Sequence, residues 1–221
     1  DVVPNAMFRY VDEAVRDHFS ASRCLLTISV GQEVHEGEKF ESTIELVNKS
    51  FSSCVLLVDD SLQRHTMALE SPKQAEDFYN LSIQAGDEWL SRNKPVYSRL
   101  QNLDKMLRWG DWLYHPQFNK KKSILEQELQ QNEAYAQAFS STIEEFLTRY
   151  YVRVEDKEAF CWDKARKLCW DYLLEECVAM CLWPELECHF EVYPSRRNAA
   201  MDYTHRHFVF PEYLDLLSYV G

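Results

Sequence analysis

The chain has 221 residues, of which 46% are hydrophobic, so we expect one domain over residues 1–221 with a substantial core. Its 36 acidic and 24 basic residues give a formal net charge of −12, which argues against a nucleic-acid partner unless a local basic patch overrides it. No apolar run reaches the roughly 18–20 residues of a membrane span, so a membrane protein is not expected.

The first predicted elements form a βαβ unit. Residues 24–30 and 53–60 read as buried strands, and the second strand ends in the carboxylates of Asp59 and Asp60. Apolar side chains at helical spacing over residues 40–51 predict the connecting helix. Such a unit implies parallel strands joined by a right-handed crossover.

The rest of the chain is expected to be mostly helical. The first predicted helix starts at Ser71-Pro72 and spans residues 71–93; it is interrupted at Pro95 and resumes up to Leu103. Further helices are predicted at 121–151, with a break near Ser140, at 156–182 and at 211–219. Short strands are predicted at 106–109 and 188–193. Strands embedded among long helices indicate an α/β fold: a single Rossmann-like domain whose mainly parallel sheet carries long helices on both faces.

Ser29 closes the first predicted strand and is the first candidate for chemistry. In an open α/β sheet, ligands bind beyond the carboxyl ends of the strands, so a serine there is a candidate nucleophile. Serine needs a base, a relay or a reactive substrate to act, and a serine that only caps the next helix would occupy the same place. The chain has no G-x-S-x-G elbow and no G-x-x-x-x-G-K-[ST] loop, which argues against a conventional esterase and against nucleotide binding.

Two later elements carry further polar candidates. Tyr172 and Glu176 lie four residues apart on a predicted helix and therefore share one face; a phenol and a carboxylate together suit recognition of an ammonium group. Tyr193 ends the last predicted strand, just before Pro194, and could pass a proton between neighbouring groups. The alternatives are a solvated glutamate beside a core tyrosine, and an aromatic side chain at the rim of the sheet.

The seven cysteines are an odd number, which favours reduced thiols and a cytoplasmic protein. Cys161, Cys169, Cys177 and Cys181 recur at helical spacing, and the chain has no C-x-x-C pair. We therefore interpret the cysteines as small core residues and expect no metal site.

These sites, in this order, resemble the tRNA-dependent cyclodipeptide synthases. That family has a catalytic Ser that ends a strand and is followed by a residue and Gly, a helical Tyr-x-x-x-Glu, and a strand-ending Tyr. The matching residues here are Ser29 with Gly31, Tyr172 with Glu176, and Tyr193. Gln32 in place of an Asn, and Pro194 after the late Tyr, resemble the second of two subfamilies. The resemblance covers nearly the whole chain and implies a fold like the catalytic domain of class I tyrosyl- and tryptophanyl-tRNA synthetases.

The resemblance further implies a ping-pong reaction on two aminoacyl-tRNAs, without ATP or any other cofactor. Ser29 would attack the ester of the first aminoacyl-tRNA, Tyr172 and Glu176 would hold its α-amino group, and Tyr193 would relay a proton while a diketopiperazine ring closes. Backbone N–H groups near Gly31 would stabilise the oxyanion. The expected partners are two aminoacyl-tRNAs, with no membrane and no metal, and a monomer is favoured.

Further residues are expected to bind the substrates. They share a strand face with Ser29, flank its loop or lie on neighbouring strands: Leu25, Thr27, Gly31, Gln32, Leu56, Val58, Glu191 and Pro194. Thr27 stands where many relatives have the smaller glycine, which would narrow the pocket. Glu191 would read a polar or cationic side chain unless it points to solvent, so the two amino acids stay unassigned.

The chain departs from the family in one region. Many members carry an arginine-rich helix after the second strand, thought to hold tRNA, whereas residues 78–94 here contain mainly Arg92 and Lys94. Two other functions remain open on the sequence: a non-catalytic α/β protein that binds a small ligand at the Ser29 loop, and a hydrolase that uses Ser29 as its nucleophile.

Overall fold

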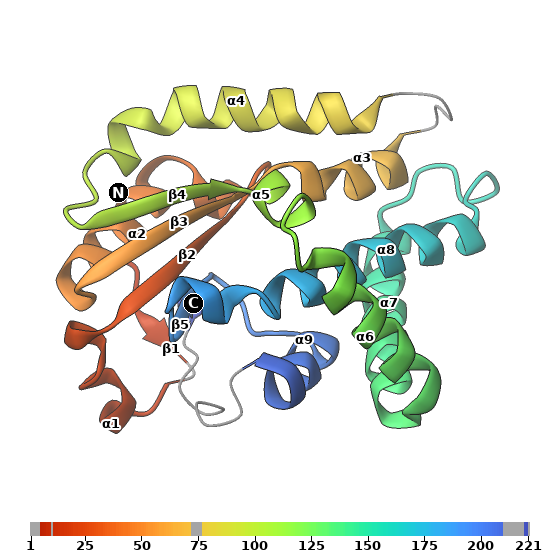
Figure 1. Ribbon diagram of the computed structural model, residues 1–221. Coiled ribbons are helices and arrows are strands. Elements are labelled where there is room, and N and C mark those ends of the chain that lie inside the picture. Colours follow the sequence, from red (N-terminus) through yellow and green to blue (C-terminus); the bar gives the residue numbers. More distant parts are fainter. Residues whose placement is uncertain (1–4, 10, 72–76, 210–218, 221) are drawn as a thin grey trace.

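The computed structural model describes residues 5–9, 11–71, 77–209 and 219–220. Its centre is a four-stranded parallel sheet with the strand order β4-β3-β2-β5 (Figure 1). The strands of this sheet are β2 (Arg23–Ser29), β3 (Ser53–Asp59), β4 (Leu103–Arg108) and β5 (Phe190–Val192). Two short strands, β1 (Phe8–Arg9) and β6 (Tyr219–Val220), pair with each other antiparallel.

Helices make up most of the other described residues. They are α1 (Glu13–Arg16), α2 (Gly37–Ser50), α3 (Arg64–Glu70), α4 (Phe78–Tyr97), α5 (Trp109–Leu113), α6 (Phe118–Gln131), α7 (Glu133–Val152), α8 (Trp162–Met180) and α9 (Ala199–Thr204), together with 3-10 turns and a π-helical turn at His205–Val209. The predicted βαβ unit is present as β2-α2-β3, and its two strands are parallel.

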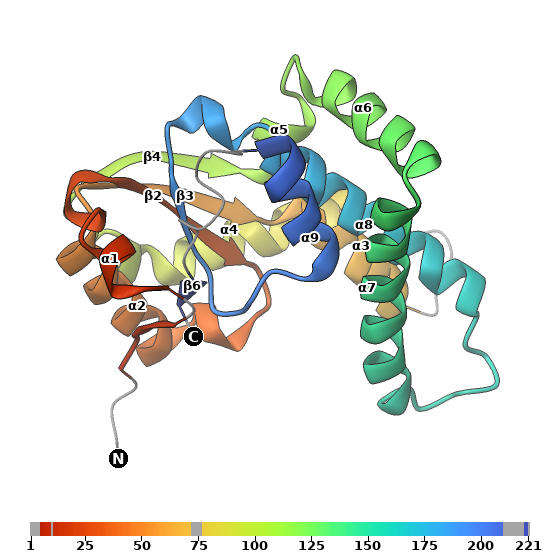
Figure 2. The same cartoon turned by 90° about the horizontal axis from the view of Figure 1, so that it is seen from below.

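Different helices cover the two faces of the sheet. On one face, Leu26 and Ile28 of β2 belong to an apolar cluster with residues of α2 and α4. On the other face, Leu25 and Leu57 belong to a larger cluster with residues of α5 to α9. In Figure 1, α4 lies above the sheet and α8 below it, and Figure 2, seen from below, shows α9 beside α8. Helices on both faces of a parallel sheet confirm the predicted fold class.

The helix predicted from Ser71 is α4, which begins later, at Phe78. Ser71 follows the last residue of α3 with an extended backbone (φ −89°, ψ 133°), so it ends a helix. Asp77 starts α4, because its side chain accepts a hydrogen bond from the backbone N–H of Asn80 at 3.1 Å. Pro72, which was predicted at the first helical position, lies outside the described residues.

Pro95 does not interrupt α4, contrary to the prediction, and the helix continues to Tyr97. A proline this close to a helix end removes one backbone hydrogen bond but leaves most of the helix unaffected. The ring of Tyr97 stacks on that of Trp89, with centroids 6.1 Å apart and an interplanar angle of 17°, which holds the last turn onto the core.

The long helical region after Lys121 breaks at Asn132 rather than near Ser140. Asn132 separates α6 from α7, and its side-chain oxygen accepts hydrogen bonds from the N–H groups of Ala134 and Tyr135 at 3.0 and 3.3 Å. This is the N-cap role in which asparagine is favoured. The break therefore lies where the first turn of α7 gains a cap.

The remaining differences concern element boundaries. The strand predicted at 106–109 is β4, which starts at Leu103 and ends before Trp109, and the strand predicted at 188–193 is the shorter β5. The helix predicted at 156–182 is α8. Most of the helix predicted at 211–219 lies outside the described residues, and Tyr219 belongs to β6.

Candidate active site

Ser29 is the last residue of β2 and lies at the carboxyl edge of the sheet. Tyr193 follows β5, the strand next to β2, and the Ser29 Oγ and the Tyr193 hydroxyl share a hydrogen bond of 2.8 Å. Gly31 turns the chain away from the strand with φ +92°, in the left-handed region that glycine tolerates. Two residues 164 positions apart are thus in direct contact where the parallel strands open.

His35 holds the backbone of Ser29. Its ring Nδ1 accepts a hydrogen bond from the Ser29 N–H at 3.0 Å, and its carbonyl accepts one from the Trp89 indole at 3.1 Å. Burial lowers the pKa of His35 to about 4, so the ring is neutral at pH 7 and keeps the lone pair that accepts this bond. His35 therefore positions the serine, and sequence reasoning missed it because an isolated histidine carries no motif.

Tyr172 and Glu176 reach the same cavity from α8. Both are partly buried, and together with Ser29 and Tyr193 they line a cavity of about 350 Å³. This volume lies within the usual range for a site that binds a small molecule. The structure thus brings the four residues predicted as catalytic into one cavity.

Burial raises the pKa values of several ionisable side chains that line this cavity. It raises the pKa of Glu176 to about 8, with a further contribution from the nearby Glu191 carboxylate. Burial also raises the pKa of Tyr193 and of Tyr172 above the usual phenol range. At pH 7 both phenols keep their protons, and the Glu176 carboxyl is poised to lose its proton once a positive charge enters the cavity.

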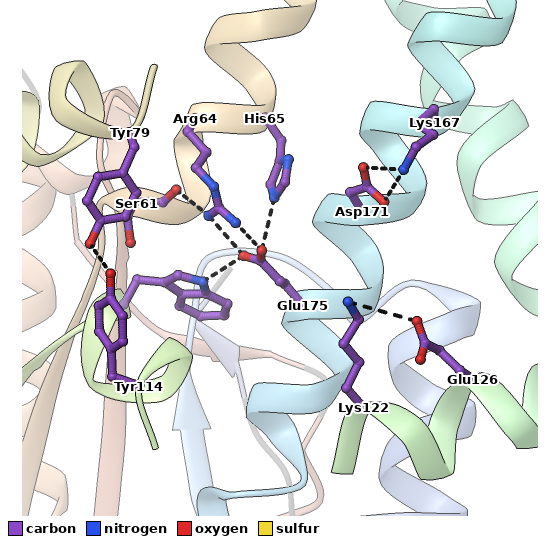
Figure 3. Close-up of polar contacts among 11 residues, drawn as sticks. Ser61, Arg64, His65, Tyr79, Tyr114, Lys122, Glu126, Lys167, Asp171 and Glu175 are labelled. Carbon is purple, nitrogen blue, oxygen red and sulfur yellow. Dashed lines mark hydrogen bonds and ion pairs between the residues drawn. The ribbon is translucent and has the colours of Figure 1, made fainter. Parts of the chain in front are cut away.

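Glu175 fixes the orientation of α8 (Figure 3). Its carboxylate forms a two-pronged ion pair with Arg64 and accepts hydrogen bonds from the His65 ring at 3.2 Å and from the Trp109 indole at 3.1 Å. Although burial opposes it, these donors hold the pKa of Glu175 below its usual value. Successive helix residues are about 100° apart, so anchoring Glu175 against α3 and α5 turns Glu176 toward the cavity.

The predicted substrate-binding residues fall into two groups. Thr27, Gln32 and Glu191 line the cavity, and the Thr27 hydroxyl donates a hydrogen bond of 3.2 Å to the Glu191 carboxylate. Glu191 is 3% exposed, so it points inward and not to solvent. Leu25 lies in the core beneath the same face of the sheet, and Gly31 and Pro194 flank the cavity without lining it.

Leu56 and Val58 do not reach the cavity, which corrects the prediction. The register pairs Ser29 with Asp59 and Thr27 with Leu57. In a parallel sheet, residues in register point to the same face, so Leu56 and Val58 pack on the opposite face, in the cluster of α2 and α4. Leu57 and Asp59 line the cavity in their place.

The rim of the cavity differs in charge from its floor. Arg149 and Arg196 line the cavity and are exposed, whereas Asp59 and Glu191 are buried, at 5% and 3% exposure. The exposed side chains that line the cavity thus include two arginines and one carboxylate, Glu145, so the rim is more basic than acidic, whereas carboxyl groups are buried deeper in the cavity.

The described residues include no helix that is both long and apolar enough to cross a membrane. They also include no group of three or more His, Cys, Asp or Glu side chains arranged to hold a metal ion. All seven cysteines are free, and five of them are buried, which fits their interpretation as core residues. Cys161 is exposed and Cys169 is half-buried, so the interpretation is wrong for Cys161.

The geometry has close counterparts among solved structures. A cyclodipeptide synthase from Fluoribacter dumoffii is 40% identical to this chain, with a TM-score of 0.90 over 98% of this chain and 96% of that one. The chain belongs to the cyclodipeptide synthases. The resemblance in the sequence is therefore confirmed, although no family model and no curated protein sequence matches the chain.

More distant cyclodipeptide synthases share the fold. The enzyme from Candidatus Glomeribacter gigasporarum, solved with Phe-tRNAPhe, is 16% identical, with a TM-score of 0.70 over 90% of this chain and 86% of that one. A Mycobacterium tuberculosis structure described as related to type I tRNA synthetases is 9% identical, with a TM-score of 0.60 over 99% and 95% of the two chains. This cyclodipeptide synthase accordingly has the Rossmann-like fold of class I synthetases.

Proposed function

We propose that this cyclodipeptide synthase takes both amino acids from aminoacyl-tRNAs and carries the first as an ester on Ser29. The observation that supports this most strongly is the 2.8 Å hydrogen bond between Ser29 Oγ and the Tyr193 hydroxyl, in a cavity that also contains Glu176. An aminoacyl-tRNA ester is already activated, so neither ATP nor a strong base is needed to acylate a serine. We also propose that residues 1–221 act as one catalytic domain, and that the protein works in the cytoplasm, where its free thiols stay reduced.

The first step forms the bond between Ser29 Oγ and the aminoacyl carbonyl carbon and breaks the bond from that carbon to the tRNA ribose oxygen. The Ser29 proton passes to Tyr193, as Tyr193 gives its own proton to the leaving ribose oxygen. Because burial raises the pKa of Tyr193, the phenol is protonated before and after the step and serves as a relay. Backbone N–H groups near Gly31 would stabilise the oxyanion.

Tyr172 and Glu176 hold the α-ammonium group of the loaded amino acid. A carboxylate paired with a cation and a phenol oxygen gives the group both charge compensation and direction. The pKa of Glu176, about 8 in the ligand-free cavity, is close to that of an α-amine, so a proton can pass between the two at little cost.

The second and third steps form the two amide bonds. The amine freed by Glu176 attacks the ester of a second aminoacyl-tRNA, and its surplus proton goes to the leaving ribose oxygen. The amine of the second amino acid then attacks the Ser29 ester. This closes the diketopiperazine ring and returns a proton to Ser29 through Tyr193.

The basic rim is the surface we assign to the tRNA acceptor end. Arg149 and Arg196 stand exposed at the cavity mouth, where a phosphate backbone leading to the cavity would pass. Helix α4 is a poor substitute, because its Arg92 pairs with Glu36 at 2.6 Å and its Asp87 pairs with Arg108. The departure from an arginine-rich helix thus fits a footprint centred on the cavity mouth.

The test is to mix the protein with charged tRNAs and to analyse small-molecule products and the intact protein by mass spectrometry. We expect a diketopiperazine, together with a protein adduct of one aminoacyl group that is absent in Ser29→Ala. Free amino acids without a ring would instead indicate a hydrolase, and neither adduct nor product would indicate a binding protein. Cyclisation by Ser29→Ala at the wild-type rate would refute the nucleophile assignment.

A further inference from the structure

Two carboxyl groups in the cavity have no task in the reaction described above. Glu176 meets the α-ammonium group, whereas Asp59 and Glu191 also line the cavity, one on each strand flanking β2. The register places Asp59 beside Ser29 and Glu191 beside Leu25, on the face of β2 that carries the serine. Both are therefore next to the position where the first amino acid would be held.

One carboxyl oxygen of Asp59 is buried without a hydrogen-bond donor in the described part of the chain. The residue is 5% exposed, and the oxygen that lacks a donor is Oδ1. Burial raises the pKa of Asp59 well above its usual value, and the carboxylates of Glu176 and Glu191 raise it further. A buried carboxyl without a donor is destabilising, so the arrangement becomes favourable only when a donor or a positive charge enters.

Glu191 is better satisfied than Asp59. It accepts a hydrogen bond from Thr27 at 3.2 Å, and although burial raises its pKa to about 7, the nearby Arg197 opposes the rise. We therefore expect a cation in the cavity to bind Asp59 more strongly than Glu191. An apolar side chain entering this cavity would leave the Asp59 oxygen unsatisfied, whereas a side chain with N–H donors would satisfy it.

We propose that Asp59, assisted by Glu191, selects a basic amino acid, with an ammonium, guanidinium or imidazolium side chain, as the residue loaded on Ser29. This inference rests on the proposed function, because it names the substrate class of the same site. The cation of the side chain binds Asp59 while the α-ammonium group binds Glu176, so the cavity recognises two positive charges of the same amino acid. Arg149 and Arg196 remain at the rim, where they meet the tRNA instead of the side chain.

The experiment supplies the protein with an equimolar mixture of all charged tRNAs and measures every diketopiperazine by mass spectrometry. The wild type should give products in which one residue is basic. Asp59→Leu should lower the ratio of basic to apolar products by roughly tenfold to a hundredfold, the effect of one charge-assisted hydrogen bond. Asp59→Asn, which keeps the shape but loses the charge, should fall in between and guards against a folding defect in Asp59→Leu.

Asp163→Asn serves as the matched control, because its side chain is 97% exposed on the same protein, and it should leave the product ratio unchanged. Wild-type products without any basic residue would overturn the inference while leaving the proposed function intact. An equal decrease of all products in Asp59→Leu would overturn it in the same way. If the wild type forms no diketopiperazine from any charged tRNA, the proposed function fails, and this inference fails with it.

Discussion

The two faces of the parallel sheet are built from the same strands but differ in chemistry. The face toward α2 and α4 is apolar along its whole length, from Leu26 and Ile28 to the rings of Phe40 and Trp89. The face toward α8 begins apolar at Leu25 and becomes polar at the carboxyl edge, with Thr27 and Ser29. The face toward α2 and α4 therefore serves packing alone. The other face carries the larger apolar cluster and becomes polar only at its carboxyl edge.

This contrast assigns the activity to one edge of one face, whereas both faces contribute to stability. The buried carboxyls and phenols of the cavity have raised pKa values because the fold holds them out of water, and that burial costs free energy. The apolar clusters on the two faces offset the cost through the burial of large side chains. Substitutions on the two faces should accordingly change different measurements.

The largest expected effect is loss of the product in Ser29→Ala with the fold retained. Ile44→Ala, on the apolar face, should do the opposite. Ile44 is fully buried on α2, so truncation should lower the free energy of unfolding by about 2–5 kcal/mol but keep the activity per folded molecule. Urea unfolding and the cyclisation assay, run on both variants, check the pair. An inactive Ile44→Ala that is fully folded would contradict the separation of the faces.

The side of β3 that faces the cavity could not be read from the sequence. Half-exposed strands alternate apolar and polar residues, but β3 is buried on both faces, so Leu56 and Leu57 look alike. Only the polar residue at the end of the strand could have indicated which of the two leucines faces the cavity. Asp59 is two residues from Leu57 and therefore shares its face, and a buried carboxylate is expected where a ligand binds.

The next effect is on stability as a function of pH, through Glu176. Its folded pKa, about 8, lies above the ordinary value of 4.5, so the carboxyl stabilises the fold below pH 4.5 and this contribution is lost as the pH rises through 8. Compared with Glu176→Gln, the ligand-free wild type should lose on the order of 3 kcal/mol between pH 5 and pH 8. Urea unfolding at the two pH values measures this difference.

Glu145→Gln is the matched control, because Glu145 also lines the cavity but is exposed. The free energy of unfolding of Glu145→Gln should change between the two pH values by the same amount as that of the wild type. Parallel profiles for the wild type and Glu176→Gln would show that Glu176 ionises as freely in the folded chain as in the unfolded one, which contradicts its burial.

A smaller effect is expected at His35, which links the two faces. Its ring accepts the Ser29 N–H, and its carbonyl accepts the indole N–H of Trp89 from the apolar face. His35→Leu should leave a buried N–H unsatisfied, costing about 1–3 kcal/mol of stability, and should lower kcat more than it raises KM, because the serine is misplaced. His35→Asn can offer an oxygen near the position of Nδ1 and should restore part of kcat. Equal losses in both variants would assign His35 to packing alone.

The Rossmann-like fold, the βαβ unit and the cluster of Ser29, Tyr172, Glu176 and Tyr193 could be predicted, because apolar runs, helical spacing and the ordered resemblance all indicate them. His35 and the Asn132 cap could not. Each acts by accepting backbone N–H groups, that of Ser29 in one case and those of Ala134 and Tyr135 in the other. Such contacts depend on how the chain turns in space, which a single residue type does not specify.

The smallest expected effect distinguishes the rim from the floor. Arg149→Ala should raise KM for charged tRNA a few-fold at low salt, with kcat unchanged. The slope of log KM against the logarithm of the salt concentration should fall by about 1, the effect of losing one phosphate contact. Arg166→Ala is the control, because Arg166 is also exposed but lies outside the cavity and pairs with Glu144 at 2.6 Å. If the two variants shift KM equally, the exposed arginines act only through the overall charge of the chain. If only Arg149→Ala reduces the salt dependence of KM, the tRNA approaches over the rim, and the buried carboxyl groups contact only the amino acid that it carries.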